Sequence, residues 1–296
     1  MPLKLITDSG CDLPYTFLEE NNIESLELTV TSGKKEFKDD HGKTISYKEF
    51  FESMRKGATP TTSQVNSQTF YNSFERNYKE RNSSIYISLS SGLSGTYDSA
   101  VFAKKEILEK YEDADIAIVD SRSASAGYAL CVYCVNELIK EGKSKEEILK
   151  FTDENIDRIN TFYTVDDLKY LKRGGRITTT SALVGGLLNI KPVLYVDSQG
   201  KLLPLFKVQG RKKAIHSMFQ MMEKYIESLE DQTIFLCHAD SEEDIDELKN
   251  IILKKYKPKK IITTIMGTTI GSHAGPGTLV ISFFGKKRGE IIKNSK

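Results

Sequence analysis

Short apolar segments, each followed by a segment with helical periodicity, alternate through the first half of the chain. The apolar segments, typical of buried strands, are residues 3–7, 25–31, 84–89 and 115–119. The helical segments are residues 14–21, 47–56, 67–79, 96–111, 126–141 and 144–158. The last begins with Ser144 and Glu147, which are spaced as in a capping box. This alternation favours an α/β fold with a mostly parallel open sheet and flanking helices.

The pattern changes in the second half of the chain. Two apolar segments, 192–197 and 202–208, flank Ser198-Gln199-Gly200 and predict a β-hairpin. Further strands are expected at 161–165, 233–238, 261–265 and 278–284, and helices at 178–189, 211–229 and 242–256. We therefore expect two domains: an N-terminal α/β domain over residues 1–160 and a C-terminal α+β domain with a mixed sheet over residues 161–296.

Polar, glycine-containing loops directly follow three of the predicted strands, at residues 8–12, 90–95 and 120–127. In parallel sheets, ligands bind beyond the carboxyl ends of the strands, so these loops are expected to crowd one edge of the sheet. Another polar loop is expected at 57–64, and a glycine-rich turn containing His273 at 272–277.

Composition and charge exclude some classes of protein. Lys+Arg 42 against Asp+Glu 41 gives a net charge of +1, so nucleic acid is not the expected partner. No apolar run reaches a membrane-spanning length, and MPLKLITDSG lacks the apolar stretch of a signal peptide. We expect a cytoplasmic protein without stable membrane insertion. The lysine-rich end from Lys286 to Lys296, including Arg288, is expected to be a solvated tail.

Two of the four cysteines, Cys131 and Cys134, form a C-x-x-C motif inside an apolar helical segment. A zinc site would need a second pair of ligands at similar spacing, which the sequence lacks, and a redox motif normally opens a helix. We interpret both cysteines as core residues and expect no metal.

The loop at residues 90–95 is open to several interpretations. It precedes a helix, whose amino end offers free N–H groups and partial positive charge for an anion. Gly92 and Gly95 allow close backbone approach, and Ser94 adds a hydroxyl. Equally, Ser94 could simply cap the helix. Residues 92–96 also approach the nucleophile motif G-x-S-x-G, but Thr96 replaces the second glycine. A Ser94-dependent acyl hydrolase or thioesterase, with His273 as base, is therefore weakened but stays open.

Six segments together resemble the DegV family and appear in its order over nearly the whole chain. They are TDSGCDL (7–13), TTSQ (61–64), SSGLSGTYDSA (90–100), YLKRGGRI (170–177), LLNIKPVL (187–194) and GSHAGPG (271–277). The resemblance implies a two-domain α/β protein that binds one long-chain fatty acid between its domains. It also implies a non-catalytic subunit of bacterial fatty acid kinase, without a cofactor, which presents the carboxylate to a separate kinase protein that makes the acyl phosphate.

The resemblance also assigns roles to single residues. Thr62 and Ser94 would hydrogen-bond the carboxylate with help from the Gly95 amide, and His273 would lie close to the same head group. Contacts to the head group or the kinase are implied for Ser63, Arg176 and Arg211.

A bound fatty-acid tail would need an apolar tunnel. Each buried CH₂ contributes roughly 0.8 kcal/mol, so the tail would decide affinity and the head group orientation. Candidate tunnel residues are Phe102, Tyr128, Leu183, Leu187, Leu188 and Ile190. For any single one, ordinary core packing is the simpler interpretation.

Overall fold

The computed structural model describes residues 2–177 and 189–290. Its first sheet has four parallel strands in the order β2-β1-β6-β7. Their bounds are Leu3–Asp8 for β1, Glu24–Leu26 for β2, Ser83–Ser88 for β6 and Ile116–Asp120 for β7. Strands β1 and β6 are the central pair, and every residue of β6 is buried.

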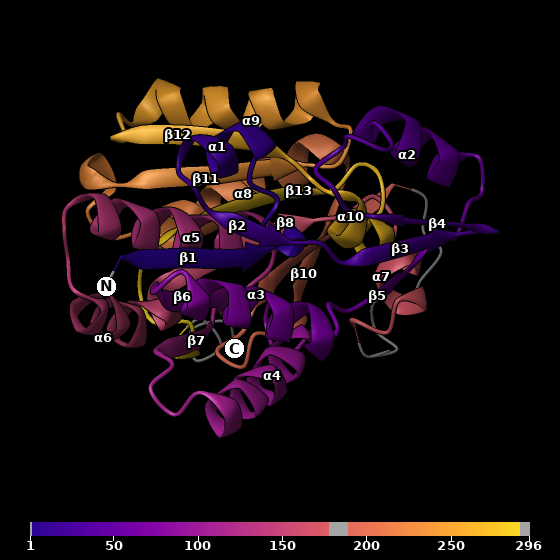
Figure 1. The fold of residues 1–296 in the computed structure, drawn as a ribbon. Coiled ribbons are helices and arrows are strands. Elements are labelled where there is room, and N and C mark those ends of the chain that lie inside the picture. Colours follow the sequence, from indigo (N-terminus) through magenta and orange to yellow (C-terminus); the bar gives the residue numbers. More distant parts are fainter. Residues whose placement is uncertain (1, 178–188, 291–296) are drawn as a thin grey trace.

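Helices cover both faces of this sheet (Figure 1). Their bounds are Tyr15–Glu20 for α1, Ser67–Lys79 for α3, Thr96–Lys110 for α4, Ser125–Lys140 for α5 and Lys145–Asn155 for α6. Helices α3 and α4 pack together against β6 and β7, whereas α5 lies on the opposite face. Helix α5 contacts β1 and β6 on one side and the second sheet on the other, so it joins the two sheets. The Ser144–Glu147 capping box at the start of α6 is confirmed.

The second sheet has six strands in the order β10-β9-β8-β13-β11-β12. Only β11 and β12 are parallel neighbours; the other pairs are antiparallel. The strands are β8 (Ile159–Thr164), β9 (Ile190–Val196), β10 (Leu202–Gln209), β11 (Thr233–His238), β12 (Lys260–Ile265) and β13 (Leu279–Phe284). Helices α8 (Arg211–Tyr225) and α9 (Glu242–Lys255) pack on the face away from α5. The predicted α/β fold, with a parallel N-terminal sheet and a mixed C-terminal sheet, is confirmed.

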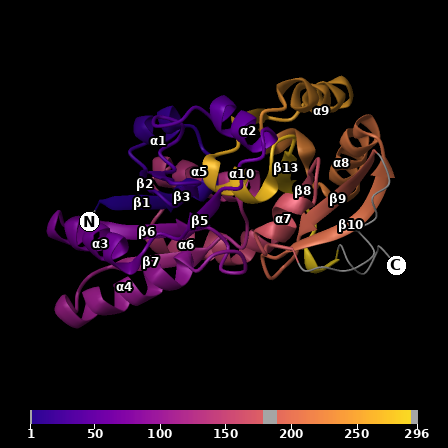
Figure 2. The ribbon, with the colours of Figure 1, turned by 90° about the vertical axis from the view of Figure 1, so that its right-hand side faces the viewer.

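A small third sheet lies beside the two large ones. Its strands, in the order β4-β3-β5, are β3 (Thr29–Ser32), β4 (Lys35–Lys38) and β5 (Thr61–Ser63). Three helices lie nearby: α2 (Tyr47–Arg55), α7 (Lys169–Arg173) and α10 (Thr268–Ala274). Helix α10 contacts β3, β5, α2 and α7, and it occupies the middle of the molecule (Figure 2).

Buried apolar side chains form two clusters on opposite faces of the six-stranded sheet. One cluster runs from Leu5 and Ile85 in the parallel sheet, through Val132 of α5, to Phe235 of β11. The other cluster, beneath α8 and α9, contains Phe162 of β8. Helix α5 contacts strands on both sides of the expected boundary at residue 160, and the first cluster contains residues from both sides. The division into two domains stays a prediction.

Several local expectations were wrong. Residues 25–31 form two short strands instead of one, the expected loop at 57–64 contains β5, and the turn at 272–277 begins inside α10. Strand β5 exists because it pairs with β3, about thirty residues earlier, which no local pattern indicates. Most of the helix expected at 178–189 lies outside the described residues.

Two further expectations concern the cysteines and the membrane. Cys131 is buried on α5 and Cys134 is half-buried one turn later, as expected for core residues, and burial raises the pKa of both thiols. In the ranges 2–177 and 189–290, no helix combines the length and apolar character needed to cross a membrane.

Candidate functional site

A cavity lies where the carboxyl edge of the parallel sheet meets the six-stranded sheet and α10. Its empty space is about 690 Å³, counted with the open solvent at its mouth. Most of its wall is apolar, formed by Leu28, Leu89, Leu93, Ala124, Leu171, Val196, Leu202, Met266, Ile270, Ala274 and Val280. The polar residues of the wall include four of the expected site residues: Thr62, Ser94, Arg176 and His273. We call these four the head-group region and the apolar residues the chain wall.

Thr62 and His273 meet inside the cavity. Thr62 lies on β5, His273 lies in the last turn of α10, and 2.7 Å separates Thr62 Oγ1 from His273 Nε2. Distant carboxylates hold the start of α10 in place. Asp39 accepts hydrogen bonds from the Thr268 and Thr269 amides (3.3 and 2.9 Å), and Asp12 accepts one from the Gly267 amide (2.8 Å).

His273 is neutral at physiological pH. Burial, together with the nearby cations Arg176 and Arg173, lowers the pKa of its imidazole to about 4. Its Nδ1 is buried and has no hydrogen-bond partner among the described residues. The backbone of Gly174 passes so close that a Cβ there would lie 2.1 Å from Nδ1. The ring is therefore a neutral, tightly enclosed hydrogen-bonding group.

Ser94 lies just before α4, but it is not the N-cap of that helix. Gly95 is the N-cap, and no side chain caps the helix. Ser94 Oγ lies 2.9 Å from Thr96 Oγ1 and accepts a 3.3 Å hydrogen bond from the Thr96 amide. Ser94 therefore bonds the first amide of α4 without being the N-cap residue. A Cβ on Gly95 would lie 2.3 Å from Gln64 Oε1, so a larger residue there would displace the Gln64 side chain.

The three polar loops do meet at one edge of the parallel sheet, as expected. Asp8 accepts a hydrogen bond from the Leu89 amide (3.1 Å), and Asp120 accepts two from Ser91, from its amide (3.2 Å) and its hydroxyl (2.6 Å). Ser90 Oγ donates to the Gly200 carbonyl (2.9 Å), which ties the loop to the β9–β10 hairpin. These bonds fix the segment that carries Ser94.

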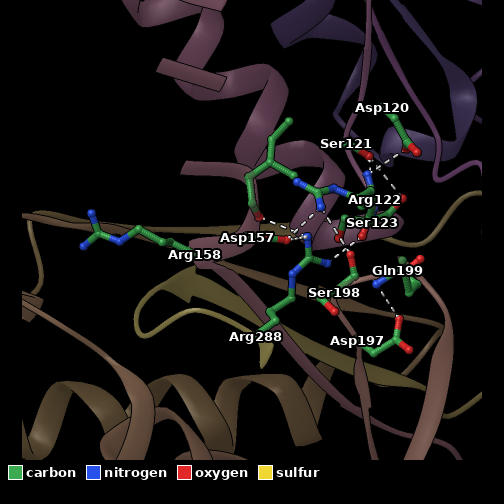
Figure 3. A network of polar contacts seen from close by, with 12 residues as sticks. Asp120, Ser121, Arg122, Ser123, Asp157, Arg158, Asp197, Ser198, Gln199 and Arg288 are labelled. Atoms are coloured by element: carbon green, nitrogen blue, oxygen red, sulfur yellow. Dashed lines mark hydrogen bonds and ion pairs between the residues drawn. The ribbon is translucent and has the colours of Figure 1, made fainter. Parts of the chain in front are cut away.

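A polar network continues from Asp120 into the C-terminal part of the chain (Figure 3). Asp120 accepts a hydrogen bond from the Arg122 amide (2.8 Å), and the Arg122 guanidinium pairs with Asp157 (3.0 Å) and donates to the Ser198 carbonyl (3.3 Å). Arg288 donates to the Arg122 carbonyl (2.6 Å) and is wholly buried, which lowers its pKa to about 10. The expectation that Arg288 belongs to a solvated tail is wrong, because its guanidinium completes this network.

The other expected site residues differ in position. Arg176 is part of the cavity wall, and its Nε donates to the Leu93 carbonyl (3.0 Å) next to Ser94. Arg211 is not part of the described wall and pairs with Asp244 (2.9 Å). Ser63 is exposed on β5 beside Thr62. The roles expected for all these residues stay predictions.

None of the three expected tunnel residues in the described part of the chain belongs to the described wall. Phe102 is 55% exposed on the outer side of α4, so this expectation is wrong. Tyr128 is buried, but its hydroxyl bonds Asp8 (3.0 Å) within the core, and Ile190 is a half-buried residue at the start of β9. Leu183, Leu187 and Leu188 lie outside the described residues. Sequence analysis missed the chain-wall residues of α10, since seven residues between glycines give little periodicity.

The geometry gives no support to the hydrolase interpretation. A Ser–His–acid triad needs one hydrogen bond from serine to histidine and another from histidine to a carboxylate. Here Ser94 Oγ bonds Thr96, His273 Nε2 bonds Thr62, and His273 Nδ1 has no acceptor in the described part of the chain. The same part of the chain contains no cluster of His, Cys, Asp and Glu able to hold a metal ion.

Comparison with known proteins gives consistent matches over the whole chain. A family model described as "Uncharacterised protein, DegV family" matches residues 2–286. A DegV domain-containing protein from Clostridium perfringens is 43% identical over 281 residues, which cover 95% of this chain and 97% of that protein. A Thermotoga maritima protein named "Fatty acid-binding protein" is 32% identical over 94% of this chain and 96% of its own length.

A solved structure gives the same result. It is described as "Fatty Acid Binding of a DegV family Protein from Thermus thermophilus", and it is 28% identical with a TM-score of 0.88, over 96% of this chain and all of that one. The motifs, the fold and these matches agree, and the chain belongs to the DegV family.

Proposed function

We propose that the protein binds one long-chain fatty acid in the cavity, with the carboxylate at the head-group region and the tail along the chain wall. The observation that carries this proposal is the cavity itself, which combines hydroxyl, imidazole and guanidinium groups with an otherwise apolar wall. The Thermotoga and Thermus relatives, named for fatty-acid binding, support it.

The physical properties of the residues fit such a ligand. A charge-assisted hydrogen bond to a carboxylate contributes about 1.5–3 kcal/mol. The cationic Arg176 and the neutral donors of Thr62 and Ser94 can supply such bonds, together with the Gly95 amide. A fully enclosed tail contributes on the order of 10 kcal/mol. Affinity would therefore come mainly from the chain wall and orientation from the head-group region.

The finer part of the proposal concerns the reaction. The protein would be a carrier without catalytic residues that presents the carboxylate to a separate kinase protein, which forms the acyl phosphate. The motif resemblance supports this role, and we assign contact with the kinase or the transferred phosphate to Ser63, Arg176 and Arg211.

Lipid extraction tests the proposal directly. Purified protein should release a long-chain fatty acid that mass spectrometry identifies, or should bind added palmitate or oleate in a titration. Supplying a fatty acid kinase protein and ATP should then give acyl phosphate only when this protein is present. If no fatty acid is extracted and none binds, the proposal is wrong; if binding occurs without acyl phosphate, only the kinase role fails.

A further inference from the structure

The hydroxyl groups in the cavity wall fall into two sets. The first set is paired within the protein: Thr62 with His273, Thr161 with Ser282 Oγ (2.9 Å), and Thr278 with the Ala274 carbonyl (3.0 Å). The second set has no hydrogen-bond partner among the described residues. Its members lie among apolar groups, where an unpaired hydroxyl is unfavourable.

Tyr163 and Thr269 are the main members of this second set. Tyr163, on β8, is 5% exposed and has Leu194 and Val280 beside it on the neighbouring strands. Thr269, on α10, is 3% exposed. Ser125 Oγ is also unpaired, but it has the buried Asp12 carboxyl close by as an acceptor.

The Tyr163 and Thr269 hydroxyls form no hydrogen bond with the described part of the chain. Burial raises the pKa of Tyr163, so its hydroxyl keeps its proton and can both donate and accept. On the same helix as Thr269, Ser272 donates to the carbonyl four residues earlier, that of Thr268 (2.7 Å). Thr269 is in the first turn, where the residue four positions earlier belongs to β12, and this back-bond is not formed.

The position of Thr269 relates it to the head group. It precedes His273 by four residues, so both side chains lie on one face of α10, one turn apart. A ligand held at His273 and running along α10 would pass Thr269. An unsubstituted chain would exclude water from the two hydroxyls and offer them only CH₂ groups, whereas an oxygen substituent would give them a partner.

We propose that the cavity is built for a fatty acid that carries a hydroxyl or keto group on its chain, and that Tyr163 and Thr269 bind this oxygen. The inference rests on the proposed function and narrows its substrate class. In this proposal, the two residues determine which of several acyl chains of equal length binds most tightly.

The test measures dissociation constants for octadecanoic acid and for a positional series of hydroxyoctadecanoic acids. Comparison among isomers cancels the cost of desolvating the ligand hydroxyl. One isomer should bind roughly three- to tenfold tighter than the others, the size of one net hydrogen bond. Tyr163→Phe or Thr269→Val, both close in shape to the native residue, should remove that advantage.

Tyr195→Phe is the matched control. Tyr195 is 3% exposed on β9, on the opposite face of the same sheet, so the same chemical change there should keep the isomer preference. Equal binding of all isomers, or a preference that survives both cavity substitutions, would overturn the inference while octadecanoic acid still binds. Failure of every acid to bind would overturn the proposed function as well.

Discussion

The head-group region and the chain wall share one cavity, yet they are held in place by different interactions. Three of the four head-group residues depend on a specific polar contact with a remote part of the chain, since Thr62 meets His273 and Arg176 meets the Leu93 carbonyl. The fourth, Ser94, bonds the nearby Thr96. The chain wall depends on apolar packing among the six-stranded sheet, α10 and the loops that follow the parallel strands. A substitution in the wall should therefore change affinity in proportion to lost area, whereas one in the head-group region should change orientation more than affinity.

The largest loss of stability is expected from a substitution in the buried polar network that contains Arg288. Arg288→Ala would leave the Arg122 and Ile156 carbonyls without their donor, and should lower the free energy of unfolding by about 3 kcal/mol. Urea denaturation measures this, with the exposed Lys287→Ala as control. Equal stability of the two variants would show that the stability of the fold does not depend on this network.

The next effect should come from the chain wall. Ile270→Ala removes three carbons from the wall of α10, and the affinity for palmitate should fall about tenfold, or about 1.4 kcal/mol. Leu253→Ala, on an exposed site of α9, is the control. Under saturating ligand, acyl phosphate formation should stay near the wild-type rate. A lower rate would contradict the expectation that wall residues determine affinity and not the orientation of the carboxylate.

A smaller loss of affinity is expected in the head-group region. In the proposed binding mode, Ser94→Ala and Thr62→Ala would each remove one hydrogen bond to the carboxylate, so affinity should fall about fivefold, near 1 kcal/mol. Acyl phosphate formation with the kinase at saturating ligand should nevertheless drop clearly, because the carboxylate is less well oriented. Unchanged turnover would contradict the role of these hydroxyls.

The smallest effect concerns pH. The pKa of His273 is about 4 in the folded protein and near 6.5 when unfolded, so below pH 6.5 the unfolded state binds the proton more readily. Stability should therefore fall as pH drops. Between pH 7 and 6, wild type should lose less than about 1 kcal/mol relative to His273→Gln, in which the other titrating groups are unchanged. Parallel stability curves would mean that His273 is not held neutral.

Local sequence patterns predicted the parts of the fold that local interactions determine. The strand–helix alternation, the Ser144 capping box and the Ser198–Gly200 hairpin each depend on neighbouring residues. Local patterns failed to predict the elements whose formation depends on contacts distant in the sequence. Strand β5 needs β3, and α10 is a short helix stabilised by Asp12 and Asp39, more than 200 residues away in the sequence.

The candidate site shows the same limit. Residues 62 and 273 are 211 positions apart, so no spacing rule connects them; only the family resemblance placed them together. Phe102 was a plausible tunnel residue because it is a large apolar residue on a helix near the expected head-group site, but the packing of α4 on α3 leaves it on the outside. Arg288 was missed because the neighbouring lysines are exposed and nothing local distinguishes it from them.

The close passage of Gly174 beside His273 has a consequence for how this site tolerates change. The backbone of Gly174 has φ −72°, which any residue can adopt, so the position selects glycine through excluded volume alone. A single methyl group there would displace the imidazole from Thr62 without altering any hydrogen-bonding group. The head-group region can thus be disrupted by steric exclusion, at a residue that carries no side chain of its own.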